Sequence, residues 1–137
     1  MVDIKITYMG DLRTKAKHLK SGTVLNTDAP VDNMGKGESF SPTDMLATAL
    51  GSCMLTIMGI KANQHEVDIK DTTVDISKEM SENPRRISRL ALKITFQNNI
   101  EPKYQKLFER AAHQCPVSKS IHPDIDESIE FIYLKDS

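Results

Sequence analysis

The chain has 137 residues, with 18 Lys and Arg against 19 Asp and Glu, and a formal net charge of −1. This length suits one compact domain, and we predict a single domain over residues 1–137. The balanced charge excludes the basic stripe of a nucleic-acid-binding protein and the polybasic anchor of a membrane-surface protein. Two cysteines are too few for a secreted disulfide scaffold, and no apolar signal core opens the sequence. We therefore predict a cytoplasmic protein.

The first part of the chain predicts three strands and a long loop. Ile4, Ile6 and Tyr8 alternate with polar residues, which is the period of a half-buried strand. The loop at 28–40 is rich in Gly and polar residues, and loops of this length in small domains often carry function. The three strands are expected at residues 4–8, 12–19 and 23–27.

A long apolar helix is expected over residues 42–63. Ser41 is a favourable N-cap, Pro42 fits the first helical position, and Asp44 follows three residues after the cap. No charged residue interrupts 45–60, so the helix is apolar nearly all round and needs protein on several sides. A helix of this kind in so short a chain predicts a partner subunit.

The second half of the chain predicts an α+β domain in the order βββ-α-ββ-α(α)-β. In the expected strand 67–80, the alternation of apolar residues changes phase, which predicts a bulge near residues 71–73. A proline opens each of the two later helices, and the first of them ends before Pro116 because the residue before a proline disfavours helical geometry. The expected strands are 67–80, 85–97 and 129–133, and the expected helices are 102–114 and 116–121.

Cys53 lies in the apolar run LGSCMLTIMG, about three turns inside the expected helix. The positive end of the helix dipole acts only within the first turn, so the helix gives this sulfur little help in ionising. A reactive thiolate there would need a cation from elsewhere, because burial opposes ionisation. Taken alone, the position is more typical of inert core packing.

Cys115 precedes Pro116 at the expected start of a short helix. Free backbone N–H groups there favour an anionic sulfur, although a buried cysteine at a helix junction explains the position equally well. A zinc site is less favoured, because His113 and Cys115 lack a second close pair and the four histidines show no ligand spacing. The GKGES segment in the loop lacks the P-loop pattern.

The segments SFSPTDMLATALGSCMLTIM and HQCPVSKSI together resemble the osmotically inducible protein C and organic hydroperoxide resistance family (OsmC/Ohr). The resemblance covers nearly the whole chain and implies the OsmC-like fold: an intertwined homodimer with long central helices between strands of both chains. It implies a thiol peroxidase that reduces organic hydroperoxides, with Cys53 as the peroxidatic and Cys115 as the resolving thiol. It also implies a dithiol reductant, which in the family can be a lipoylated protein, and neither a cofactor nor a metal.

One position departs from the family pattern. Hydroperoxide reductases of the family carry a Pro-Glu pair whose glutamate orients an arginine onto the thiolate, whereas this chain has Thr43 after Pro42. Threonine cannot form the charge-assisted fork, so we expect Asp44 or Glu38 to take its place. Arg13 is the best match for the arginine. The chain resembles a divergent OsmC-like branch.

Two functions follow from this pattern. The first is reduction of organic hydroperoxides through a Cys53 sulfenic acid and a Cys53–Cys115 disulfide. The alternative is an OsmC-like redox-sensing or small-molecule-binding protein with little peroxidase turnover, which Thr43 favours. Other arginines that could face the thiol are Arg85, Arg86 and Arg89.

Overall fold

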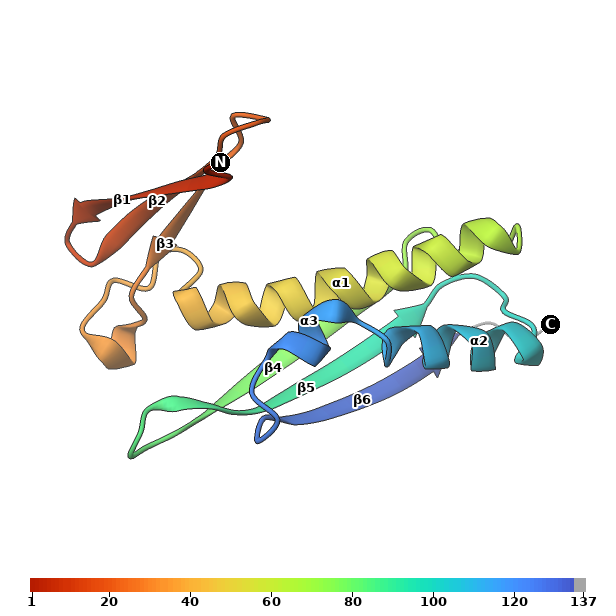
Figure 1. Ribbon diagram of the computed structural model, residues 1–137. Coiled ribbons are helices and arrows are strands. Elements are labelled where there is room, and N and C mark those ends of the chain that lie inside the picture. The colour runs from red at the N-terminus through yellow and green to blue at the C-terminus, as the bar shows by residue number, and fades with distance from the viewer. Residues whose placement is uncertain (135–137) are drawn as a thin grey trace. The chain divides into compact units, whose positions relative to one another are not determined.

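The computed structural model describes residues 1–134 and divides the chain into two compact units, residues 1–46 and the chain from residue 47 onward (Figure 1). Each unit is described by itself. The order of helices and strands confirms the predicted α+β class. The elements are β1 (Ile4–Gly10), β2 (Arg13–His18), β3 (Val24–Asp28), the 3-10 turn η1 (Val31–Asn33), α1 (Pro42–Gln64), β4 (Thr73–Ser81), β5 (Arg86–Phe96), α2 (Pro102–Ala112), α3 (Pro116–Ser120) and β6 (Asp126–Tyr133).

The first unit contains a three-stranded antiparallel sheet in the order β1-β2-β3. The β1–β2 turn needs left-handed backbone, and Gly10 adopts it at no steric cost with φ of 83°. The register places Arg13 of β2 directly opposite Asp28 of β3. The pairing of β2 with β3 alone therefore places the Arg13 guanidinium beside the Asp28 carboxylate.

One face of β1 lacks the cover that its sequence predicts. Ile4, Ile6 and Tyr8 alternate as expected, but their exposed fractions are 56%, 66% and 65%. Apolar side chains repeated at this spacing normally mark the buried face of a strand. The expectation of a half-buried strand is therefore wrong for β1, because no side chain of residues 1–46 covers this face.

Helix α1 begins where the sequence predicts. The Ser41 N–H donates to Asp44 Oδ2 at 2.9 Å, and the Asp44 N–H donates to Ser41 Oγ at 3.0 Å. This reciprocal capping box satisfies two backbone donors that the first turn would otherwise leave unpaired. The helix is long and apolar enough to cross a membrane, but core helices of soluble proteins share these properties.

The second unit holds a sheet in the order β4-β5-β6, with β5 in the centre. β4 pairs with β5 antiparallel, whereas β5 and β6 are parallel and are joined by the crossover through α2 and α3 (Figure 1). Alternate residues of β5 are buried, and Phe96 stacks on Tyr133 of β6 with ring centres 4.8 Å apart. The core of this unit includes Leu50, Met54, Met58, Leu90, Ile94, Phe96 and Phe108.

The start of β4 differs from the prediction. Residues 67–72 are an irregular segment with a turn at 70–71, where the Lys70 N–H donates to the Asp68 carboxylate at 2.9 Å and Thr72 Oγ1 donates to the Ile69 carbonyl at 2.6 Å. The phase change in the sequence marks this turn and not a bulge. The register irregularity of β4 lies further along the strand, between Glu79 and Met80.

Candidate functional site

The two cysteines meet within the second unit. Cys53 lies in the middle of α1 and is partly exposed, whereas Cys115 is the N-cap residue of α3 and has no exposed surface. Both are free thiols, and their side chains lie close enough for Cys53 to affect the pKa of Cys115. Residues from two distant segments therefore form one thiol pair.

Burial raises the pKa of the Cys115 thiol, and the hydrogen bond with Cys53 raises it further. The N–H groups of Ser118 and Val117 at the start of α3 act in the opposite direction and favour the thiolate, as the sequence predicts. Their effect is outweighed, and the thiol makes no regular capping hydrogen bond. Of the two interpretations that the sequence leaves open for Cys115, the buried cysteine at a helix junction describes its surroundings, because desolvation outweighs the N–H groups.

We expect the alkylation of Cys115 to rise with pH at a higher midpoint in the folded protein than in the protein unfolded by urea. Since the folded pKa lies above the unfolded one, this thiol stabilises the fold fully below the unfolded pKa, and the contribution is lost as pH rises through the folded pKa. The measurement is mass spectrometry of iodoacetamide-treated Cys53→Ser protein across the alkaline range. The midpoint is the readout, because burial also slows the reaction at every pH. Equal midpoints in the folded and unfolded states would contradict the assignment.

The position of Cys115 depends on two residues that the sequence does not single out. Ser118 Oγ lies 2.8 and 2.9 Å from the two carboxylate oxygens of Glu127, so the hydroxyl of α3 donates to a side chain of β6. This bond fastens the short helix that carries Cys115 to the edge strand of the sheet. A five-residue helix has little stability of its own, so the anchor sets where the thiol lies.

Arg13 is held by two carboxylates of the first unit. Its Nε lies 2.6 Å from Asp28 Oδ1, and one Nη contacts Glu38. Asp28 is only 3% exposed, and it also accepts the Glu38 N–H at 3.0 Å. A buried carboxylate needs partners of this kind. The hydrogen bond with Asp28 raises the pKa of Arg13 above its ordinary value, so the guanidinium stays charged at every working pH.

The two acidic residues that could replace the family's glutamate make different contacts. Glu38 contacts Arg13, as expected of one of the two substitutes, whereas the Asp44 carboxylate accepts the Ser41 N–H at the start of α1. Thr43 Oγ1 lies 3.2 Å from Ser41 Oγ. Sequence reasoning missed Asp28, although its place at the end of β3 in register with Arg13 is a usable signal.

Arg13 belongs to the first unit and Cys53 to the second, so the prediction that this guanidinium faces the sulfur stays a prediction. Among the other arginines, Arg89 pairs with Glu79 at 3.3 Å and Asp126 at 3.4 Å, and Arg86 donates to a carbonyl beside it at 2.9 Å. Within residues 1–134, no three His, Cys, Asp or Glu side chains gather as metal ligands would.

Residues 35–130 match the family described as OsmC-like protein. The chain belongs to the OsmC-like protein family. It is 55% identical to a crystallised protein from Psychrobacter arcticus 273-4 whose name assigns it to osmotic stress induction and the detoxification response. The match covers 96% of each chain with a TM-score of 0.93. No curated protein sequence matches the chain.

More distant OsmC-like structures share the fold. An organic hydroperoxide resistance protein OsmC from Legionella pneumophila is 17% identical over 96% of this chain and 98% of its own, with a TM-score of 0.71. An OsmC-like protein from Mycoplasma pneumoniae is 16% identical over 98% of both chains, with a TM-score of 0.76. These matches confirm the OsmC-like fold, and the family favours a soluble core helix over a membrane span for α1.

Proposed function

We propose that this OsmC-like protein is a cysteine-based peroxidase that reduces organic hydroperoxides in the cytoplasm. The observation that carries the proposal is that the side chains of Cys53 and Cys115 lie close enough to interact, so that Cys53 affects the pKa of Cys115. Two thiols placed in this way can pair as a disulfide, whereas two inert core cysteines have no need to meet. Hydroperoxide resistance proteins with the same fold support the choice of substrate class.

The reaction has two steps at the thiol pair. The Cys53 thiolate attacks the terminal peroxide oxygen, the O–O bond breaks, and the alkoxide leaves as an alcohol after taking a proton, so Cys53 becomes a sulfenic acid. The Cys115 sulfur then attacks the Cys53 sulfur, and the hydroxyl leaves as water after taking a proton. A dithiol reductant, for which a lipoylated protein is one source, exchanges with the disulfide and restores both thiols.

The raised pKa of Cys115 suits the resolving role. At neutral pH this thiol keeps its proton, so it can donate its hydrogen bond to a Cys53 thiolate and stabilise the attacking form. Arg13 supplies the positive charge in this proposal, with Asp28 and Glu38 holding its orientation. The helix cannot supply that charge, because Cys53 lies far from the start of α1.

The apolar surroundings of Cys53 favour hydroperoxides with apolar tails. Leu50 and Met54 on α1 are fully buried, and Ile57 is partly buried. Each methylene that a substrate buries against such residues adds about 0.8 kcal/mol of binding, which hydrogen peroxide lacks. Cumene hydroperoxide should therefore react faster than hydrogen peroxide.

The test is mass spectrometry of the reduced protein after one equivalent of cumene hydroperoxide, followed by dihydrolipoamide. The proposal expects a Cys53–Cys115 disulfide, one equivalent of the alcohol, and restored thiols after the reductant. If Cys53 remains a free thiol, the peroxidase proposal is wrong. If the disulfide forms but turnover with the reductant is absent, the redox-sensing alternative is correct, and Thr43 is the feature that favours it.

We also propose that the working molecule is a homodimer with one domain per chain, residues 1–137. The exposed apolar face of β1 and the small share of α1 that is buried both leave apolar surface that a second copy would cover. A groove of about 590 Å³ runs along α1 beside Ile76, and its small lining residues allow close approach of another helix. Light scattering at micromolar concentration should give twice the chain mass.

Gly59 gives a sharper test of the dimer. A Cβ at Gly59 meets no atom within 4 Å outside the neighbouring backbone of its own helix in residues 1–134, so Gly59→Ala alone should stabilise an isolated α1 by about 1 kcal/mol. We expect Gly59→Leu instead to raise the dimer dissociation constant by about tenfold or more, because the partner's surface approaches there. Analytical ultracentrifugation of both variants measures this. Gln64→Leu is the control, because this exposed residue is five positions further along and therefore lies on a different face of the same helix. An unchanged dissociation constant for Gly59→Leu would place the interface elsewhere.

A further inference from the structure

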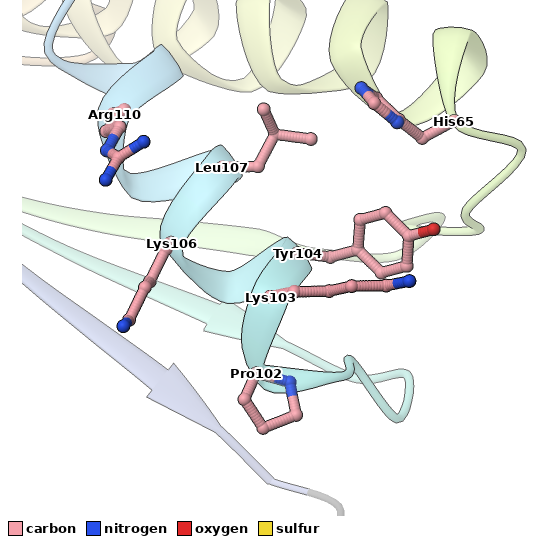
Figure 2. A pocket seen from close by; sticks show the side chains of 7 residues that line it. All are labelled: His65, Pro102, Lys103, Tyr104, Lys106, Leu107 and Arg110. Atoms are coloured by element: carbon pink, nitrogen blue, oxygen red, sulfur yellow. The ribbon is translucent and has the colours of Figure 1, made fainter.

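A positively charged pocket lies in the second unit between the C-terminal end of α1 and helix α2. We name it the α2 pocket; its volume is about 630 Å³, within the range of small-molecule sites. Figure 2 shows His65, directly after α1, on one side and the remaining side chains along α2 on the other. Its lining residues are His65, Pro102, Lys103, Tyr104, Lys106, Leu107 and Arg110.

The cations of the α2 pocket repeat along one face of the helix. Lys103, Lys106 and Arg110 are spaced by three and four residues, which places their side chains in one row. Like charges at this spacing repel one another, so the row destabilises the helix unless an anion lies against it. No acidic residue lines the pocket.

Two of these cations have no partner within residues 1–134. Lys103 lies 3.9 Å from Glu101 and its ammonium sits 4.9 Å from the Tyr104 ring centre, whereas Lys106 and Arg110 form no side-chain ion pair or hydrogen bond in the described chain. Glu109, the acidic residue beside Arg110, instead accepts a hydrogen bond from Tyr133 at 2.7 Å. The ammonium and the guanidinium fork therefore remain available to phosphate oxygens, which both groups bind well.

The other half of the α2 pocket is aromatic and apolar. The His65 and Tyr104 rings are 5.8 Å apart at an angle of 58°, and Leu107 lies next to them along the helix. Figure 2 shows Tyr104 and Lys103 extending from the same end of α2, below His65. Figure 2 shows Lys106 and Arg110 on the other side of α2 from Tyr104, so a ligand that fills the pocket crosses the helix, with its flat ring against Tyr104 and its phosphate end toward Arg110 and Lys106.

We propose that the α2 pocket binds a small molecule that carries a phosphate chain joined to an aromatic ring, as a nucleotide does. The cation row contacts the phosphates, and Tyr104 and Leu107 contact the ring. The site stands on residues separate from Cys53, Cys115 and Arg13, so it does not depend on the proposed peroxidase activity. Binding involves no covalent step.

The test is isothermal titration of the full-length reduced protein with ADP, inorganic pyrophosphate and adenosine at low ionic strength. ADP should bind more tightly than pyrophosphate, and adenosine should bind least, because only ADP engages both halves of the pocket. Lys106→Ala/Arg110→Ala should weaken ADP binding by about tenfold or more, and added salt should weaken the wild type in the same direction. Tyr104→Ala should reduce the preference for ADP over pyrophosphate.

The double variant Lys20→Ala/Lys70→Ala is the matched control, because it removes the same charge from exposed positions outside the pocket. It should bind ADP as the wild type does, and circular dichroism should show all variants folded. The proposal is overturned if neither ADP nor pyrophosphate binds saturably. Equal losses in the control and in Lys106→Ala/Arg110→Ala would also overturn it, since they would indicate attraction to net charge alone.

Discussion

Replacing Cys53 by serine should abolish the reduction of cumene hydroperoxide, with a loss of about a hundredfold or more. A serine hydroxyl is nearly the same size but is a far weaker nucleophile at neutral pH, so the fold should survive while the reaction stops. The measurement is peroxide consumption with dihydrolipoamide as the reductant, together with thermal unfolding as a check on the fold. Turnover at the wild-type rate would remove Cys53 from the proposed reaction.

Cys115→Ser separates the two thiol roles. This variant should consume about one equivalent of peroxide and then stall or become over-oxidised at Cys53, because no second thiol captures the sulfenic acid. Mass spectrometry should find added oxygen on Cys53 and no intramolecular disulfide. Continued turnover by Cys115→Ser at the wild-type rate would show that the external dithiol resolves the sulfenic acid directly.

Arg13→Ala should slow peroxide reduction by roughly a hundredfold at neutral pH, because it removes the only cation that the proposal gives to the Cys53 thiolate. Alkylation of Cys53 at neutral pH should slow in parallel. Peroxide stopped-flow and iodoacetamide kinetics measure the two effects. Lys15→Ala, on the same strand, is the control.

Asp28→Asn distinguishes a positioning effect from a loss of charge. The variant keeps Arg13 but replaces its buried carboxylate partner by an amide of similar shape. Turnover should fall less than in Arg13→Ala, and alkylation of Cys53 at neutral pH should also slow less. If both variants leave the alkylation rate of Cys53 unchanged, the cation lies elsewhere, and Arg85, Arg86 and Arg89 become the next variants.

Local patterns in the sequence predicted most of the fold. The start of α1 follows from Ser41 and Asp44, whose capping contacts are local and are present as expected. The prolines that open α2 and α3 set both helix starts for the same reason. The predicted start of β4 was wrong, because the segment 67–72 is held by side-chain hydrogen bonds. The spacing of apolar residues in the sequence does not reveal these bonds.

The candidate site was less predictable, because its contacts join distant segments. Periodicity alone left Cys53 as core packing, and only the resemblance paired it with Cys115. The pKa direction of Cys115 needs its burial, which a position in sequence does not give. The Ser118–Glu127 and Arg13–Asp28 contacts likewise depend on tertiary placement or strand register.

The parallel pairing of β5 with β6 has a consequence for biosynthesis. Glu127, which anchors the helix that carries Cys115, lies in β6, which is synthesised after the other five strands described here. Cys53 is synthesised much earlier and cannot be held against its partner thiol until that strand has paired with β5. A nascent chain in an oxidising cell therefore carries two separated thiols, and unregulated oxidation during translation is a hazard that the completed fold removes.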